Sequence, residues 1–200
     1  MKWMWALVVL GMVWAAVAQM LFAFPLHYRG IHDPAYYGDV PELRKYIRRG
    51  ADVDEWDGDG WTPLMYAARD GHVDACRVLL DSGASLGGCA DCNYTPLYVA
   101  ASEGHAEVVR LLLQHGAPPN DTVTGGWAPV HVATIRGCPD IIDMLLKAGA
   151  DPNAMIDKGD RPLHRFSERN ALEVVNALLA GGADPNGRTF RCSTPLHVAA

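Results

Sequence analysis

The stretch Gly60-Trp61-Thr62-Pro63-Leu64-Met65-Tyr66-Ala67-Ala68 decides the fold, because its Thr-Pro-Leu core returns along the chain at a fixed spacing. Related tripeptides begin at Thr95, Ala128, Arg161 and Thr194, each 33 residues after the one before. A fixed period of this length indicates a structural repeat whose units stack on one another. The chain is therefore predicted to be a repeat array.

Each tripeptide marks the start of a helix. Thr62 can accept a hydrogen bond from an unpaired backbone N–H of the first turn, and Pro63 gives up no hydrogen bond at the first helical position. The small pair Ala67-Ala68 then lets a neighbouring helix approach closely. Gly71 ends the helix, since glycine adopts the left-handed conformation readily, and Asn170 replaces it in the last complete repeat.

A second helix follows in each repeat. The run 108–113 is almost wholly apolar, as expected of a buried stripe. A second glycine series ends these helices: Gly50, Gly83, Gly116, Gly149 and Gly182. The segment before the next tripeptide, such as 52–61, is rich in Asp, Asn, Gly and Pro, which suits an extended loop or hairpin. Each unit is therefore expected to be helix, turn, helix and finger loop.

Taken together, these motifs resemble the ankyrin repeat, whose period is also 33. The resemblance covers about residues 29–200. It implies an all-α, ankyrin-type helix-turn-helix solenoid with hairpin-like finger loops, preceded by one hydrophobic helix. On this register there are a degenerate capping repeat (29–56), four complete repeats (57–89, 90–122, 123–155 and 156–188) and a truncated sixth repeat (189–200). Either the chain is a fragment, or another surface covers the face that the missing helix exposes.

Residues 1–26 are predicted to be a signal anchor or a signal peptide. From Trp3 to Phe24 there are 22 residues without a charged side chain. Since roughly 20 apolar residues span the ~30 Å hydrocarbon core, a single-pass membrane anchor fits this run, residues 3–24. The small residues before Gln19 also fit cleavage near Ala18, which would give a secreted or periplasmic protein. The run stays apolar past that site, which favours the anchor.

Composition and motifs argue against several functions. The net charge of −6 and the pI of about 5.7 provide no basic face for phosphates, so a nucleic-acid partner is not expected. The sequence contains no Gly-rich phosphate loop, no HExxH motif and no nucleophile elbow. No catalytic residue, no cofactor and no enzymatic activity are expected, and the chain is expected to be a monomer.

Three patterns imitate metal sites. Histidines recur at one register: His131, His164 and His197. In the ankyrin family this histidine is structural. Cys89 and Cys92 form a lone CxxC, whereas zinc normally needs two more ligands nearby; inert thiols or a strained disulfide are the alternatives. The acidic loop 52–59 lacks the ligand spacing and closing Glu of a calcium loop, and is interpreted as a solvated tip. No metal site is expected.

Asn93-Tyr94-Thr95 and Asn120-Asp121-Thr122 read as glycosylation sequons. They matter only if the repeats face a secretory lumen. The sequence leaves that question open.

The resemblance implies that a partner contacts the finger tips and the residues just before the inter-helix turn, on a concave surface. These positions are Asp59, Trp61, Arg69, Asp70, Asp91, Tyr94, Ser102, Glu103, Trp127, Ile135, Arg136, Lys158, Asp160, Glu168 and Arg169. Trp61, Tyr94 and Trp127 share one register, and aromatic residues often dominate interface energies. Packing of finger on finger explains them equally well.

The predicted function is therefore a non-catalytic scaffold or adaptor, tethered to a membrane, that binds a protein segment with basic and apolar residues. The alternatives are an exported soluble ankyrin protein, or a regulatory arm of a larger protein whose effector region lies beyond residue 200.

Overall fold

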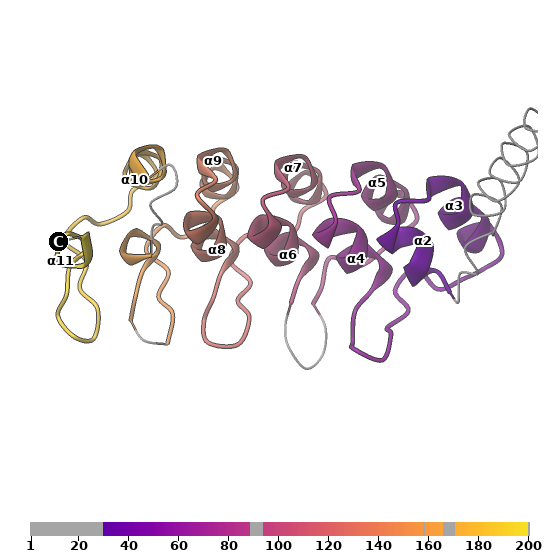
Figure 1. Cartoon of the computed structure of the whole chain (residues 1–200), viewed down its shortest axis with the longest axis horizontal. Helices are drawn as coiled ribbons and strands as arrows, with labels where there is room; N and C mark the ends of the chain where they lie inside the picture. The colour runs from indigo at the N-terminus through magenta and orange to yellow at the C-terminus, as the bar shows by residue number, and fades with distance from the viewer. Residues whose placement is uncertain (1–29, 89–93, 158, 166–170, 200) are drawn as a thin grey trace, which may run out of the picture.

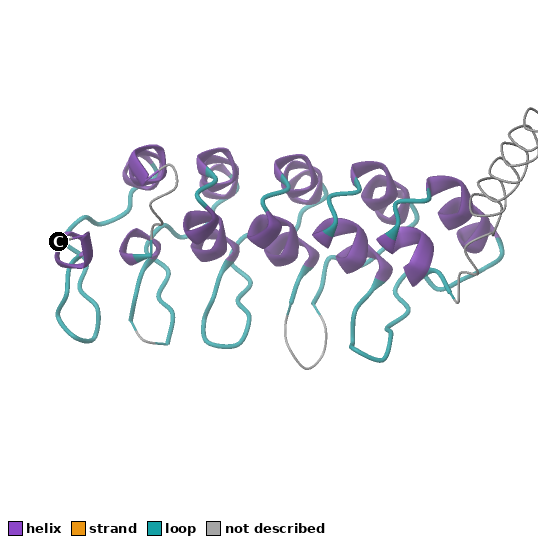
Figure 2. Cartoon of the chain, in the orientation of Figure 1, coloured by secondary structure: helices purple, strands orange, loops and turns teal. Residues whose placement is uncertain are grey.

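The computed structural model describes residues 30–88, 94–157, 159–165 and 171–199, which stack into one elongated array (Figure 1). Within these ranges every regular element is helical (Figure 2). The predicted all-α repeat solenoid is therefore confirmed. None of the helices in these ranges has the length and apolar character that crossing a bilayer requires. The predicted anchor, residues 1–26, lies outside the described residues, as does the CxxC motif.

Each repeat contributes a first helix, a second helix and a finger loop, and these form three layers along the array (Figure 1). The first helices are α2 (His32–Tyr36), α4 (Pro63–Arg69), α6 (Pro96–Glu103), α8 (Pro129–Arg136), the 3₁₀ helix η1 (Pro162–His164) and α11 (Pro195–Ala199). The second helices are α3 (Val40–Arg48), α5 (Val73–Asp81), α7 (Ala106–Gln114), α9 (Pro139–Lys147) and α10 (Ala171–Ala180). The helix starts predicted at Pro63, Pro96 and Pro129 are confirmed.

One continuous apolar core runs through the stack, because each helix packs on its counterpart in the next repeat. Leu64 and Leu97 on the first helices are at most 1% exposed. Leu79 and Leu112 on the second helices are fully buried at the equivalent register. Burial of these positions in all four complete repeats explains why the apolar pattern keeps its period so strictly.

The helix starts are capped in two ways. The Thr95 hydroxyl accepts a hydrogen bond from the Tyr98 N–H at 3.1 Å, as predicted from the Thr-Pro motif. Ala128 has no hydroxyl, and its own N–H donates instead to Nδ1 of His131 at 3.1 Å. Nε2 of His131 lies 3.0 Å from the Ala154 carbonyl of the next finger. This histidine therefore joins a helix start to the neighbouring repeat, which is a structural role.

The turns between helices also connect neighbouring repeats. Nε2 of His105 lies 2.8 Å from the carbonyl oxygen of Arg69, one repeat earlier. Gly71 has φ +74°, and a Cβ at this position would come within 2.6 Å of the His105 ring. Glycine is required here for both its conformation and its lack of bulk. Cys138 stands at the histidine register in the following repeat, where Arg136 Nη2 instead donates to the Glu103 carbonyl at 2.9 Å.

The finger loops are joined by side-chain contacts that repeat with the same period. The backbone N–H groups of Ser85, Asp151 and Asp184 donate to the side chains of Asp54 (2.7 Å), Asn120 (2.8 Å) and Asn153 (2.8 Å), respectively. Counting the loop 52–61 as the first finger, the acceptor position of the second finger is Gly87, which has no acceptor side chain. The donor position of the third finger is Pro118, which has no N–H. This finger contact is therefore missing at one interface.

The fourth repeat departs from the expected pattern. A full first helix is expected from Pro162, but η1 is a 3₁₀ helix of three residues that ends at His164. Ala67, Ala100 and Ala133 are fully buried in the preceding repeats, and the same register holds Phe166, outside the described residues. A phenylalanine at a register that elsewhere packs around a methyl group is the sequence feature that sets this repeat apart.

Candidate protein-binding surface

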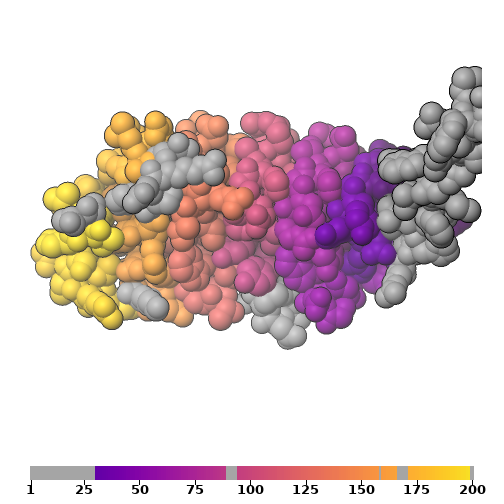
Figure 3. All heavy atoms as spheres, in the orientation of Figure 1, coloured from indigo at the N-terminus to yellow at the C-terminus, as the bar shows by residue number. Residues whose placement is uncertain are grey.

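The finger loops and the exposed side of the first helices form one surface, called here the finger face. The described repeats are in contact along the whole array (Figure 3). The predicted partner-binding residues within the described ranges are Asp59, Trp61, Arg69, Asp70, Tyr94, Ser102, Glu103, Trp127, Ile135, Arg136 and Asp160. Asp91, Lys158, Glu168 and Arg169 lie outside those ranges.

The aromatic residues at the end of each finger pack against the first helix that follows. Ring centroids are 5.3 Å apart for Trp61 and Tyr66, and 5.5 Å apart for Tyr94 and Tyr98. Trp61 and Tyr94 also lie 6.5 Å apart across the repeat boundary. Tyr94 nevertheless remains 37% exposed, and Trp61 and Trp127 are partly exposed. The row therefore supports the fingers and still presents ring surface to solvent.

Arg69 is held among three of these rings. Its guanidinium carbon lies 5.0 Å from the Tyr36 centroid, 5.6 Å from Trp61 and 5.1 Å from Tyr66. Such distances place a cation within reach of each ring's negative face. Asp70 pairs with the same guanidinium at 2.9 Å, and this hydrogen bond is the main reason that the pKa of Arg69 is raised. Arg69 and Asp70, both predicted, thus contact each other.

Asp57 organises the acidic first finger. Its carboxylate accepts hydrogen bonds from the Tyr66 hydroxyl at 2.6 Å and from the N–H groups of Trp61 and Asp59, both at 2.9 Å. Burial alone would raise the pKa of Asp57, but these hydrogen bonds outweigh it and the pKa is lowered. Burial, followed by the hydrogen bond and charge of Asp57, raises the pKa of Tyr66 to about 12. Within this largely exposed loop, Asp57 therefore also has a structural role.

Arginine side chains also link neighbouring repeats in the middle and C-terminal part of the finger face. Arg165 lies 5.3 Å from the Trp127 ring centroid and pairs with Asp160 at 2.9 Å. Two predicted residues are thus linked through a third that sequence reasoning missed. The predicted pair Arg136 and Glu103 is also brought together, with a side-chain separation of 3.5 Å.

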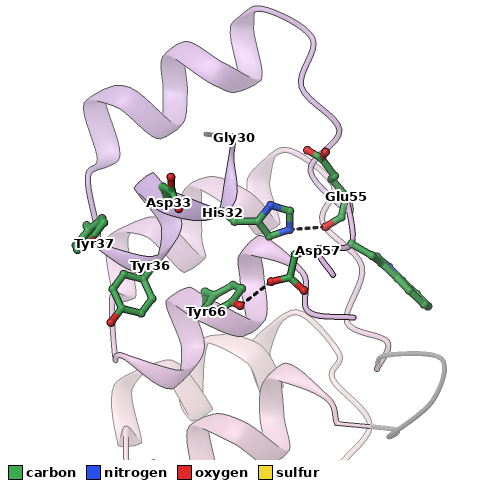
Figure 4. Close-up of a pocket in the computed structure, with 9 residues that line it drawn as sticks. Gly30, His32, Asp33, Tyr36, Tyr37, Glu55, Asp57 and Tyr66 are labelled. Atoms are coloured by element: carbon green, nitrogen blue, oxygen red, sulfur yellow. Dashed lines mark hydrogen bonds between the residues drawn. The ribbon is translucent and has the colours of Figure 1, made fainter. Parts of the chain in front are cut away.

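Near the N-terminal end, the finger face is hollowed by a cavity of about 520 Å³ between α2 and the first finger (Figure 4). Four aromatic residues line it, namely Tyr36, Tyr37, Trp56 and Tyr66. Three carboxylates line it as well, from Asp33, Glu55 and Asp57. Sequence reasoning named none of the seven as partner-binding: five lie in the degenerate capping repeat, and Asp57 and Tyr66 do not recur at their registers in the later repeats.

One contact fixes the two walls of this cavity relative to each other. Nε2 of His32 lies 2.8 Å from the Glu55 carbonyl oxygen and 3.1 Å from that of Trp61 (Figure 4). A single imidazole therefore ties α2 to the finger. This contact therefore links the two walls of the cavity.

Among the described residues, no three His, Cys, Asp or Glu side chains are grouped so that they could hold a metal ion. Burial raises the pKa of the Cys76 thiol to about 12, so this thiol stays protonated and is a poor nucleophile.

Comparison with known proteins gives a consistent result. A family model of ankyrin repeats matches residues 31–123, 86–156 and 130–200. The chain is 41% identical over 56 residues to human Ankyrin repeat domain-containing protein 39, covering 28% of this chain and 31% of that protein. It is 47% identical over 53 residues to Dauer abnormal formation protein 25 of Caenorhabditis elegans, covering 26% and 14%, respectively.

A third match is to Ankyrin repeat, SAM and basic leucine zipper domain-containing protein 1 of Colobus guereza. It is 48% identical over 48 residues, which is 24% of this chain and 10% of that protein. In all three cases the chain spans less than a third of the relative's length. The matches therefore cover only a part of each relative.

Proposed function

Because the chain belongs to the ankyrin repeat family, we propose that it is a non-catalytic scaffold or adaptor that binds a protein partner on its finger face. Ankyrin repeats indicate a protein–protein interaction module. The observation that carries the assignment to this face is the row of Trp61, Tyr94 and Trp127, which keeps exposed ring surface at one register of successive repeats. Partly exposed aromatic side chains on a rigid support are typical of interface hot spots.

The charge difference between the first and last fingers supports one orientation of the partner segment along the finger face. The first finger, 52–61, carries five acidic residues and no basic one, a charge of −5. The last finger, 184–193, carries one aspartate and two arginines, a charge of +1. Complementary charges contribute orientation and association rate more than affinity. The partner segment is therefore expected to place its basic residues at the N-terminal end of the finger face.

Site-specific crosslinking in cells tests this function. A photoreactive benzoylphenylalanine at Tyr94 should crosslink to a discrete partner, whereas the same residue at Gln114, exposed on α7, should not. The identified partner is then purified and its affinity measured. The triple variant Trp61→Ala, Tyr94→Ala, Trp127→Ala should bind at least about tenfold more weakly, as expected when hot-spot rings are lost.

The control variant Arg77→Ala, Arg110→Ala, Asp143→Ala changes exposed residues of the second helices. It should bind with unchanged affinity, and urea unfolding should show that both triple variants are folded. Equal crosslinking at the two sites, or an unchanged affinity of the aromatic variant, would remove the finger face as the binding surface.

We also propose that residues 3–24 tether the repeats to a membrane. The support is their 22-residue run without a charged side chain. The intact mass and N-terminal residue of the native protein, from membrane and soluble fractions, test this. Met1 or Lys2 in the membrane fraction fits the tether, whereas Gln19 in the soluble fraction means cleavage after Ala18 and an exported protein.

A further inference from the structure

We propose that the cavity between α2 and the first finger receives a lysine or arginine side chain of the partner segment. This inference rests on the proposed function, because it names the chemistry of one partner residue. The cavity lies at the acidic end of the finger face (Figure 4). Three of its aromatic side chains are open to solvent: Tyr36 is 41%, Tyr37 53% and Trp56 49% exposed. Rings this exposed in a hollow can still bury apolar surface on binding.

The charge of the cavity selects a cation. Its carboxylates come from two separate elements, Asp33 on α2 and Glu55 and Asp57 on the finger. Among the described residues that line it, none is a lysine or arginine. The hydrogen bonds on Asp57 keep the pKa of that carboxyl low, so it remains charged near neutral pH. A carboxylate of the partner would be repelled by these three carboxylates, and a purely apolar side chain would gain no ion pair with them.

Two of the rings that line the cavity already contact a guanidinium group within the molecule. Tyr36 and Tyr66 line the cavity, and both also lie within 5.1 Å of the Arg69 guanidinium carbon. A partner cation in the cavity would meet the same type of ring, together with Tyr37 and Trp56. The combination of aromatic faces and carboxylates is what recognises a cation through both cation–π contacts and ion pairs.

The size of the cavity indicates how much of a partner enters it. About 520 Å³ lies within the range of roughly 300–1,000 Å³ found for small-ligand pockets. A helix is about 10–12 Å across with its side chains, so it would need a long groove rather than such a pocket. The cavity therefore suits one long side chain and the adjoining backbone of an extended segment.

The test uses the full chain in detergent and capped tripeptides as probes. The cationic probes are acetyl-Gly-Lys-Gly-amide and acetyl-Gly-Arg-Gly-amide. Matched probes carry norleucine, which keeps the apolar chain, or glutamate. The readout is the NMR shift of the Trp56 indole N–H, assigned with Trp56→Phe. Both cationic probes should give saturable shifts, and the norleucine probe should bind about three- to tenfold more weakly, as expected for loss of a cation–π contact and an ion pair.

A charge-neutral cavity provides the second arm. The variant Asp33→Asn, Glu55→Gln should bind the lysine probe about three- to tenfold more weakly. The control variant Asp121→Asn, Asp143→Asn removes two exposed carboxylates elsewhere and should bind it unchanged. Because both variants change the net charge equally, only a local effect separates them.

Three outcomes overturn the inference. Equal binding of the norleucine and lysine probes means an apolar site. A Trp56 shift that follows protein concentration means that a second copy of the chain fills the cavity. Binding that appears only after residues 1–29 are removed means that the chain's own N-terminus fills it. If any of these occurs while the aromatic triple variant still loses its crosslinked partner, the proposed function stands and only this subsite is wrong.

Discussion

The first and fourth complete repeats, residues 57–89 and 156–188, share one sequence period but differ in how their first helices are held. In the first, α4 runs for seven residues from a threonine cap. In the fourth, η1 has three residues and follows Arg161, whose side chain accepts no capping hydrogen bond. The second helix is retained in both, as α5 and α10. In the fourth repeat the second helix therefore still packs on its neighbour, although the described first helix is only three residues long.

The difference extends to the core beside each second helix. Leu80 in the first repeat is 8% exposed, whereas Leu179 at the same register of the fourth is 41% exposed. Leu79 and Leu178, one residue earlier, are both fully buried. The leucine at the register of Leu79 and Leu178 is thus buried in both repeats, but its neighbour is far more exposed in the fourth repeat than in the first. This offers a direct way to measure how much each surrounding contributes.

The largest expected effect comes from truncating that common position. Leu79→Ala should lower the free energy of unfolding by about 3–5 kcal/mol, because the fixed surroundings leave a cavity. Leu178→Ala should cost less, about 2–3 kcal/mol, because the shorter first helix lets the site collapse more easily. Urea unfolding followed by circular dichroism measures both. Equal costs would show that the fourth repeat is packed as tightly as the first.

A smaller effect is expected from the finger contacts. Asp54→Ala removes the acceptor for the Ser85 N–H and should cost about 0.5–1.5 kcal/mol. Gly87→Asn together with Pro118→Ser should restore the missing contact and stabilise the array by up to about 1 kcal/mol. The space exists, since a Cβ on Gly87 would meet nothing closer than 3.4 Å. Gly87→Asn alone is the control, and a gain equal to that of the double variant would contradict the mechanism.

A pH-dependent difference is expected at the register that holds Met65 in the first repeat and His131 in the third. Burial lowers the pKa of His131 in the folded state, despite two backbone hydrogen bonds that oppose the shift. Since the unfolded imidazole titrates near its ordinary pKa of about 6.5, the unfolded state binds the proton first as pH falls. The contribution of the neutral His131 to the free energy of unfolding is therefore fully present above that pH and is lost progressively below it. His131→Met should flatten this slope between pH 7 and pH 5; an unchanged slope would assign it to other groups.

Much of the fold could be predicted because the period fixes the register of every residue. The helix starts at Pro63 and Pro96 and the left-handed turn at Gly71 follow from local chemistry repeated at that register. Shortening of the first helix at Pro162 could not be predicted so directly. Ala128 also lacks a capping hydroxyl and yet precedes the full helix α8, so the residue before the proline does not indicate that η1 is short.

The candidate site was predicted less completely, for a related reason. Trp61 and Tyr94 were found because they recur, although the sequence could not decide between a packing and a binding role. Both roles are compatible with the observed ring contacts and exposure. Asp57 and Trp56 occur in one finger only, so no repeated signal marks them. A binding feature that distinguishes one repeat from the others is, for that reason, hidden from a search for periodicity.

The smallest expected effect on stability is at Asp57, but its spectroscopic signal should be clear. Asp57→Asn keeps an acceptor for the Trp61 N–H while removing the charge beside Tyr66. The pKa of Tyr66 should then fall from about 12 toward its ordinary value of about 10, measured by absorbance at high pH. Because the pKa of Tyr66 is raised in the folded state, Tyr66 stabilises the protein below pH 10, and this contribution is lost as pH rises to about 12. The free energy of unfolding of the variant should therefore decrease less steeply with pH in this window. Asp59→Asn, which acts on Tyr66 only through its charge, should shift the pKa less; an equal shift would mean that the hydrogen bond contributes nothing.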